Sequence, residues 1–126
     1  MEINSEDKRK LNRQRPTTVI VVYDRTNQQE VGLLIDLTAQ GLRIRGKVQL
    51  DSGYFYQLRL QFESQVNSRN DFNFGATCVW SDIIPGTDEC DSGFIIDDLS
   101  PTEFKLFEDL LKSLFLRTWK TSRYNY

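Results

Sequence analysis

The sequence of 126 residues contains no histidine, only two cysteines and only three prolines. Without histidine it lacks the commonest acid–base and metal-binding side chain. Cys78 and Cys90 form no CxxC pair, so neither a zinc site nor a disulfide framework is indicated, and we expect both thiols to be reduced. Phosphate-binding loops of the GxxxxGK(S/T) type and GxSxG turns are also missing. We therefore expect no enzyme activity, no cofactor and no metal.

Long apolar runs are missing as well. No run approaches the roughly 18 apolar residues of a membrane-spanning helix. The N-terminal sequence MEINSED does not have the basic and then apolar order of a signal peptide. The sequence therefore predicts a cytoplasmic protein without a membrane partner, of a length usual for one domain.

Charge is distributed unevenly along the chain, although its net value is −2. The stretch from Lys8 to Arg15 holds five of the 16 basic residues and no acidic one, which leaves 11 basic against 18 acidic residues elsewhere. A nucleic-acid duplex favours an extended basic surface, whereas one short basic arm on an acidic body suits a small polyanion. A solvated basic tail without function is the alternative interpretation of the arm.

Hydrophobic periodicity predicts a mainly β fold. Strands are expected at residues 17–23 and 30–37, and at 42–45 with Leu42 and Ile44 inward and Arg43 and Arg45 outward. Two longer strands flank a polar turn at 65–70, and a short strand is expected at 93–96. The longer strands alternate with period two at Tyr54, Tyr56, Leu58, Leu60 and Phe62, and at Phe72, Phe74, Ala76, Cys78 and Trp80.

A single helix is expected after the strands. Ser100 and Glu103 form a capping box with Pro101 at the first helical position. An apolar stripe at helical spacing then predicts an amphipathic helix from Pro101 to about Leu116. The stripe consists of Phe104, Phe107, Leu111 and Leu114.

Two short motifs offer groups that can bind a nucleotide. Arg9 and Arg13 form Arg-x-x-x-Arg, and guanidinium groups suit phosphate oxygens and guanine edges. Asp36, Thr38 and Gly41 form Asp-x-Thr-x-x-Gly, in which the glycine permits a positive φ or a close ligand approach. Taken alone, the second motif also suits an ordinary strand connection whose polar side chains bond their own backbone.

In order and spacing, the two motifs resemble those of the PilZ family, bacterial receptors for the second messenger cyclic di-GMP. Members carry Arg-x-x-x-Arg before the first strand and (Asp/Asn)-x-Ser-x-x-Gly at the end of the second. The resemblance implies a six- to seven-stranded antiparallel β-barrel of PilZ type with a C-terminal α-helix. We expect a flexible basic N-terminal arm (1–15), the barrel with its helix (16–116) and a C-terminal tail (117–126).

The resemblance implies a receptor whose arm orders over cyclic di-GMP and which signals to an unidentified protein target in trans. Lys8 precedes the first motif arginine, where a basic residue tends to favour an intercalated ligand pair, so we expect two ligands per chain. Thr38 replaces the usual serine, which predicts weaker or unchanged binding. Trp80 lies near a position where an aromatic residue borders the nucleotide in several members, although core packing explains it equally well. Motility, exopolysaccharide synthesis and pilus assembly are all family roles.

Two other functions stay open. A PilZ-like adaptor that binds only protein typically lacks one of the two motifs, whereas both are present here. A single-stranded nucleic-acid binder needs a basic, aromatic sheet face. In this sequence the aromatic residues alternate as in a core, and acidic residues gather between Asp82 and Asp98. We therefore expect no nucleic-acid partner. We also expect the protein to be a monomer or a weak dimer.

Overall fold

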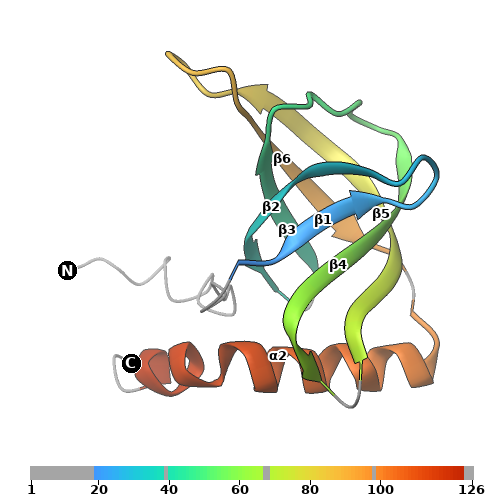
Figure 1. Ribbon diagram of the computed structural model, residues 1–126, viewed down its shortest axis with the longest axis vertical. Coiled ribbons are helices and arrows are strands. Elements are labelled where there is room, and N and C mark those ends of the chain that lie inside the picture. Colours follow the sequence, from blue (N-terminus) through green and yellow to red (C-terminus); the bar gives the residue numbers. More distant parts are fainter. Residues whose placement is uncertain (1–18, 39, 67–68, 98, 124–126) are drawn as a thin grey trace.

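The computed structural model describes residues 19–38, 40–66, 69–97 and 99–123, which fold into a barrel of six strands followed by a helix (Figure 1). The strands close in the order β1-β2-β3-β6-β5-β4, and all neighbouring pairs are antiparallel. The expected barrel with a C-terminal helix is confirmed. The elements are β1 (Val21–Asp24), β2 (Gln29–Leu37), β3 (Gly41–Gly46), β4 (Phe55–Val66), β5 (Arg69–Ile83), β6 (Cys90–Ile96) and α2 (Pro101–Arg123).

The hydrophobic core fills the inside of the barrel, as the period-two alternation predicts. Leu42 and Ile44 of β3 are buried, while Arg43 and Arg45 point outward and stay partly exposed. Burying a large apolar side chain contributes about 1.5–3 kcal/mol, so the interior supplies most of the favourable free energy of folding. The inward-facing residues of β4 and β5 are Leu58, Leu60, Phe62, Phe72, Phe74, Ala76 and Cys78.

Several predicted strand boundaries need correction. Strand β1 begins at Val21, whereas the predicted start at Thr17 lies outside the described residues. Strand β4 continues to Val66 and β5 begins at Arg69, so the connection is shorter than the predicted polar turn at 65–70. Tyr54 precedes β4 and is exposed, so it does not belong to the inward-facing set.

Trp80 lies outside the core face on which the alternation placed it. The register of β5 against β6 shifts between Cys78 and Trp80. A shift of one residue moves the following side chains to the opposite face of a strand. Cys78 is fully buried, whereas Val79 is exposed and Trp80 retains 38% of its accessible surface. Core packing is therefore the wrong interpretation of Trp80.

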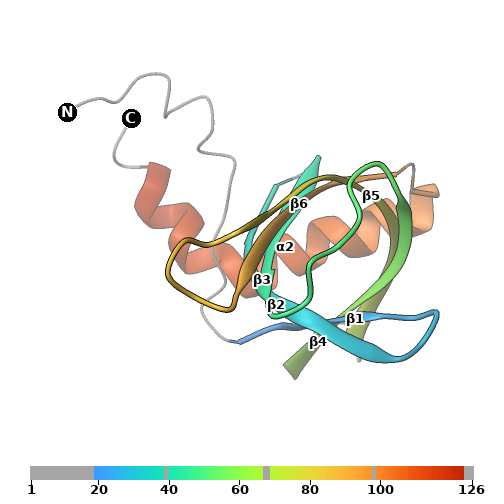
Figure 2. The same cartoon turned by 90° about the horizontal axis from the view of Figure 1, so that it is seen from above.

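Helix α2 crosses the end of the barrel where β4 meets β5, away from the loop between β5 and β6 (Figure 1). Figure 2 shows the helix passing under the barrel in the view from above. The predicted capping box is confirmed. The backbone N–H of Glu103 donates to Oγ of Ser100 at 3.1 Å, and the backbone N–H of Ser100 donates to Oε1 of Glu103 at 2.9 Å.

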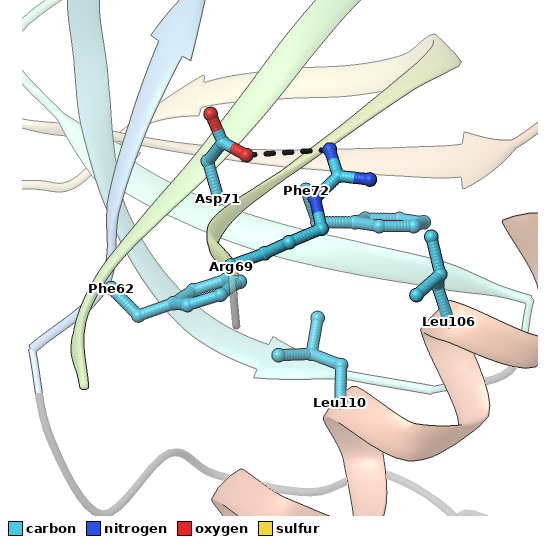
Figure 3. Close-up of a pocket in the computed structure, with 6 residues that line it drawn as sticks. All are labelled: Phe62, Arg69, Asp71, Phe72, Leu106 and Leu110. Carbon is cyan, nitrogen blue, oxygen red and sulfur yellow. Dashed lines mark hydrogen bonds and ion pairs between the residues drawn. The ribbon is translucent and has the colours of Figure 1, made fainter. Parts of the chain in front are cut away.

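The buried face of α2 differs from the predicted stripe. Phe107 is 1% exposed and packs on Phe72, with ring centroids 5.7 Å apart, whereas Phe104 is 45% exposed. Leu110, which was not in the predicted stripe, is buried against the barrel, and Figure 3 shows it beside Phe62 and Phe72. The hollow drawn there measures about 10 Å³. Because such a space holds no more than about one water molecule, this contact is packing and not a ligand site.

The helix is also longer than predicted, since it ends at Arg123 and not near Leu116. The sequence after Pro101 contains neither glycine nor proline, so no strong stop signal falls at Leu116. In both views the C-terminal part of α2 extends past the strands (Figures 1 and 2). Among the described residues, no helix combines the length and the apolar character needed to cross a bilayer.

Replacing Phe107 by alanine tests how strongly the helix is anchored to the barrel. We expect the free energy of unfolding to fall by about 3–5 kcal/mol, because a buried ring is lost and a cavity remains. Urea denaturation followed by circular dichroism measures this change. Phe104→Ala on the same helix is the control and should cost less than about 1 kcal/mol; equal losses in the two variants would contradict the packing described here.

Candidate functional site

A surface hollow of about 240 Å³ lies where the turn between β2 and β3 meets β5 and β6. It brings together four of the residues predicted from the sequence. The predicted lining residues are Asp36, Thr38, Gly41 and Trp80, and they are joined by Gln40, Arg43, Val79, Gly93 and Ile95. The hollow therefore combines a carboxylate, a guanidinium group, backbone groups and an indole in one space.

Thr38 organises the turn between β2 and β3. Its Oγ1 accepts hydrogen bonds from the backbone N–H groups of Gln40 at 3.1 Å and Gly41 at 3.0 Å, and its hydroxyl donates to the carbonyl of Gly41 at 3.3 Å. The backbone N–H of Thr38 also donates to that carbonyl at 2.8 Å. Thr38 thus has the ordinary turn-forming role that the sequence left open, and its contact with a ligand stays a prediction.

Gly41 is required by a close approach of two strands and not by a positive φ. It pairs with Ile95 of β6, and a Cβ added at Gly41 would collide with the carbonyl oxygen of Phe94. Its φ is not among the positive values of the described residues. Any side chain at this position would push β3 away from β6, which forms the far wall of the hollow.

Asp36 is the buried carboxylate of the site, with 2% of its surface exposed. It lies opposite Arg43 in the β2–β3 pair, and Oδ2 of Asp36 is 3.2 Å from Nη2 of Arg43. Nη1 of Arg43 lies 3.6 Å from Oδ2 of Asp91 on β6. Arg45 donates two hydrogen bonds to the same carboxylate, at 2.7 and 3.0 Å. Four side chains of alternating charge therefore link β2, β3 and β6.

The sequence predicts only that Arg43 points outward, and the structure adds that it lines the hollow beside Asp36. The hairpin register contains the signal: a turn over 38–41 places Leu37 opposite Leu42 and Asp36 opposite Arg43. Gly93 and Ile95 had no comparable signal, since the pairing of β3 with β6 joins segments far apart in the sequence.

The remaining predicted site residues, Lys8, Arg9 and Arg13, lie outside the described residues. Their part in binding stays a prediction. Cys78 and Cys90 are both buried free thiols. Within the described ranges, no cluster of three or more cysteine, aspartate or glutamate side chains is placed to hold a metal ion.

The ion pairs on β3 predict how stability depends on pH. The hydrogen bonds from Arg45, with a smaller contribution from Arg43, hold the pKa of Asp91 below its ordinary value of 3.8. A lowered pKa stabilises the fold above the pKa of the unfolded state, and the gain disappears as the pH falls through the folded value. Because the side chain of Arg45 is 41% exposed, solvent screening keeps this gain at about 1 kcal/mol.

We therefore expect Asp91→Asn to lower the free energy of unfolding at neutral pH and to match the wild type once the pH is well below 3.8. Urea denaturation across a pH series measures the difference. Asp88→Asn is the matched control, because Asp88 pairs with Lys47 only at 3.5 Å and both side chains are exposed. A difference between wild type and Asp91→Asn that does not vary with pH would contradict the proposed ion pair.

Comparison with solved structures finds this fold in PilZ domain proteins. The PilZ domain of YcgR from Escherichia coli, solved with c-di-GMP, is 16% identical, with 88% of this chain and 94% of that chain covered and a TM-score of 0.65. Inhibitor of motility (MotI/DgrA) from Bacillus subtilis is 12% identical, with 80% of this chain covered and a TM-score of 0.57. The match spans 49% of that protein, about half of its length.

No protein-family model matches the sequence, and no curated protein matches it either. At such low identity the two likenesses concern the fold alone. They agree with what the two sequence motifs predict: the chain has the fold of PilZ domains.

Proposed function

We propose that the protein is a non-enzymatic receptor for cyclic di-GMP that signals to a protein partner in trans. The observation that carries the proposal is the hollow beside the β2–β3 turn, where Asp36, Arg43 and Trp80 line one space. The fold supports it, because the PilZ domain of YcgR, which shares this fold, was solved with c-di-GMP.

The groups around the hollow suit a guanine base. Guanine presents O6 and N7 as acceptors, which an arginine can contact with two hydrogen bonds. Its N–H groups donate hydrogen bonds that a carboxylate such as that of Asp36 can accept. The partly exposed indole of Trp80 offers a surface on which a base can stack. In this proposal the hollow holds guanine, and Thr38 and Gly41 keep its wall in shape.

The two phosphodiesters of cyclic di-GMP need cationic side chains, and the described lining residues offer little positive charge that is not already paired. Arg43 is the one cationic side chain among the described lining residues, and it is already shared between Asp36 and Asp91. Lys8, Arg9 and Arg13 supply the missing charge in our proposal. Charge-assisted contacts contribute about 1.5–3 kcal/mol each, so a few of them give micromolar affinity, about −8 kcal/mol, after the arm has been ordered.

Titration calorimetry with cyclic di-GMP tests the proposal directly. We expect micromolar or tighter binding by the wild type. Arg13→Ala and Asp36→Asn should each bind at least about tenfold more weakly, because each loses a charge-assisted contact. Arg69→Ala serves as the matched control. It also removes an arginine, but Arg69 is exposed and pairs with Asp71 near α2, away from the hollow.

Each outcome of this titration has a definite consequence. No heat with the wild type would overturn the receptor function and favour an adaptor that binds only protein. Unchanged affinity in Arg13→Ala would show that the arm does not bind the ligand. Unchanged affinity in Asp36→Asn would show the same for the carboxylate of Asp36. An equal loss in Arg69→Ala would show that the effect is one of overall charge and not of the proposed contacts.

The number of ligands tests the role of Lys8. We expect the wild type to bind two molecules of cyclic di-GMP per chain and Lys8→Ala to bind one. Lys10→Ala removes the same charge from the same stretch and should still bind two. Calorimetry gives this number independently of the affinity, and one ligand per wild-type chain would refute the role of Lys8.

A further inference from the structure

Four residues of the site form one row across the outside of the barrel. Asp36 of β2 lies opposite Arg43 of β3, Arg43 lies opposite Gly93 of β6, and Gly93 lies opposite Trp80 of β5. Directly opposed residues of antiparallel strands project from the same face of the sheet. All four line the hollow. Gly93 is the one member of the row without a side chain, and it lies between a guanidinium group and an indole.

The indole of Trp80 occupies the space that a side chain at Gly93 would need. A Cβ built on Gly93 would lie 2.8 Å from Cζ2 of Trp80 and still closer to Nε1 and Cε2. Real Cβ atoms do not approach other atoms so closely, so even an alanine methyl group would displace the ring. The ring therefore lies close to the backbone of β6 at Gly93. Trp80 lines the hollow and keeps 38% of its surface exposed.

We propose that Gly93 is a positioning residue for ligand binding: it leaves room for the indole of Trp80 against β6, in the row with Arg43 and Asp36, so that the exposed part of the ring can stack on a purine base. The inference rests on the proposed function, since it concerns the same hollow. It adds a requirement that the two sequence motifs do not contain. The stacking surface depends on a residue that need not touch the ligand.

The barrel contains a second glycine of the same kind, which provides a control. A Cβ on Gly75 of β5 would lie 2.7 Å from Cε1 and Cζ of Phe55. Gly75 therefore also leaves space for an aromatic ring, although Phe55 is its diagonal neighbour and lies opposite Thr77. Neither Gly75 nor Phe55 lines the hollow. Alanine at Gly75 thus makes the same local change without altering the proposed stacking surface.

The first measurement needs no ligand. In a Trp119→Phe background, which leaves Trp80 as the one tryptophan, Gly93→Ala should shift the fluorescence emission to longer wavelength because the displaced indole becomes more hydrated. Gly75→Ala in the same background should leave the emission unchanged. An unshifted emission in folded Gly93→Ala would overturn the inference whether or not cyclic di-GMP binds.

The second measurement is a double-mutant cycle by titration calorimetry with cyclic di-GMP. Gly93→Ala and Trp80→Ala should each bind about tenfold more weakly, the loss expected when a base loses its aromatic neighbour. Gly75→Ala should bind like the wild type. The double variant Gly93→Ala/Trp80→Ala should bind no more weakly than Trp80→Ala, since Gly93 acts through the ring. A further loss in the double variant would overturn the inference.

Circular dichroism shows whether Gly93→Ala folds. If it does not fold, the test is the comparison of Trp80→Ala with the double variant Gly93→Ala/Trp80→Ala. Both should fold, because removing the ring makes room for the methyl group. Equal affinities of these two proteins support the inference, and a weaker double variant refutes it. Failure of the wild type to bind would overturn the proposed function, an outcome distinct from both fluorescence results.

Discussion

The antiparallel pairing of β3 with β6 is the constraint on which the candidate site depends. The two strands occupy residues 41–46 and 90–96, so the closed barrel brings together segments far apart in the chain. Through this pairing, the Asp-x-Thr-x-x-Gly motif that begins at Asp36 comes to lie beside Trp80. Gly41 allows the backbones to approach, and Gly93 leaves the space into which the indole folds. A side chain at either glycine would move one wall of the hollow relative to the other.

Both faces of this pair of strands stabilise it, but by different amounts. Inside the barrel, Leu42 and Ile44 of β3 and Phe94 of β6 are buried in the core. Outside, Asp91 of β6 pairs with two arginines of β3. Burial of each large apolar side chain contributes about 1.5–3 kcal/mol, whereas a partly exposed ion pair contributes about 1 kcal/mol or less. The apolar face therefore carries most of the stability, and the ion pairs mainly fix where Arg43 points.

The sequence predicts the features that depend on local pattern. Period-two alternation revealed the strands and most of the core, and the capping box at Ser100 marked the start of α2 at its observed residue. Features that depend on how strands meet were missed. The register shift before Trp80 turns that residue outward, and only the β3–β6 pairing shows that Gly93 belongs to the site. The position of Arg43 is intermediate between features set by local pattern and features set by strand pairing. Once the turn at 38–41 is known, the register of the β2–β3 hairpin places Arg43 opposite Asp36.

The charges of the site explain why the proposed receptor needs both of its sequence motifs. In the hollow, the carboxylate of Asp36 is balanced by Arg43, which is itself shared with Asp91, so this wall offers directional hydrogen bonds but little spare positive charge. Outside residues 8–15 the chain has 11 basic and 18 acidic residues, a field that opposes a ligand with two negative charges. In the proposed mechanism the barrel recognises the bases, and the segment from Lys8 to Arg15 neutralises the phosphates. In this proposal, binding requires that segment to meet the barrel over the ligand. The proposed surface then exists only in the bound state, which is what would let a partner protein distinguish it from the free receptor.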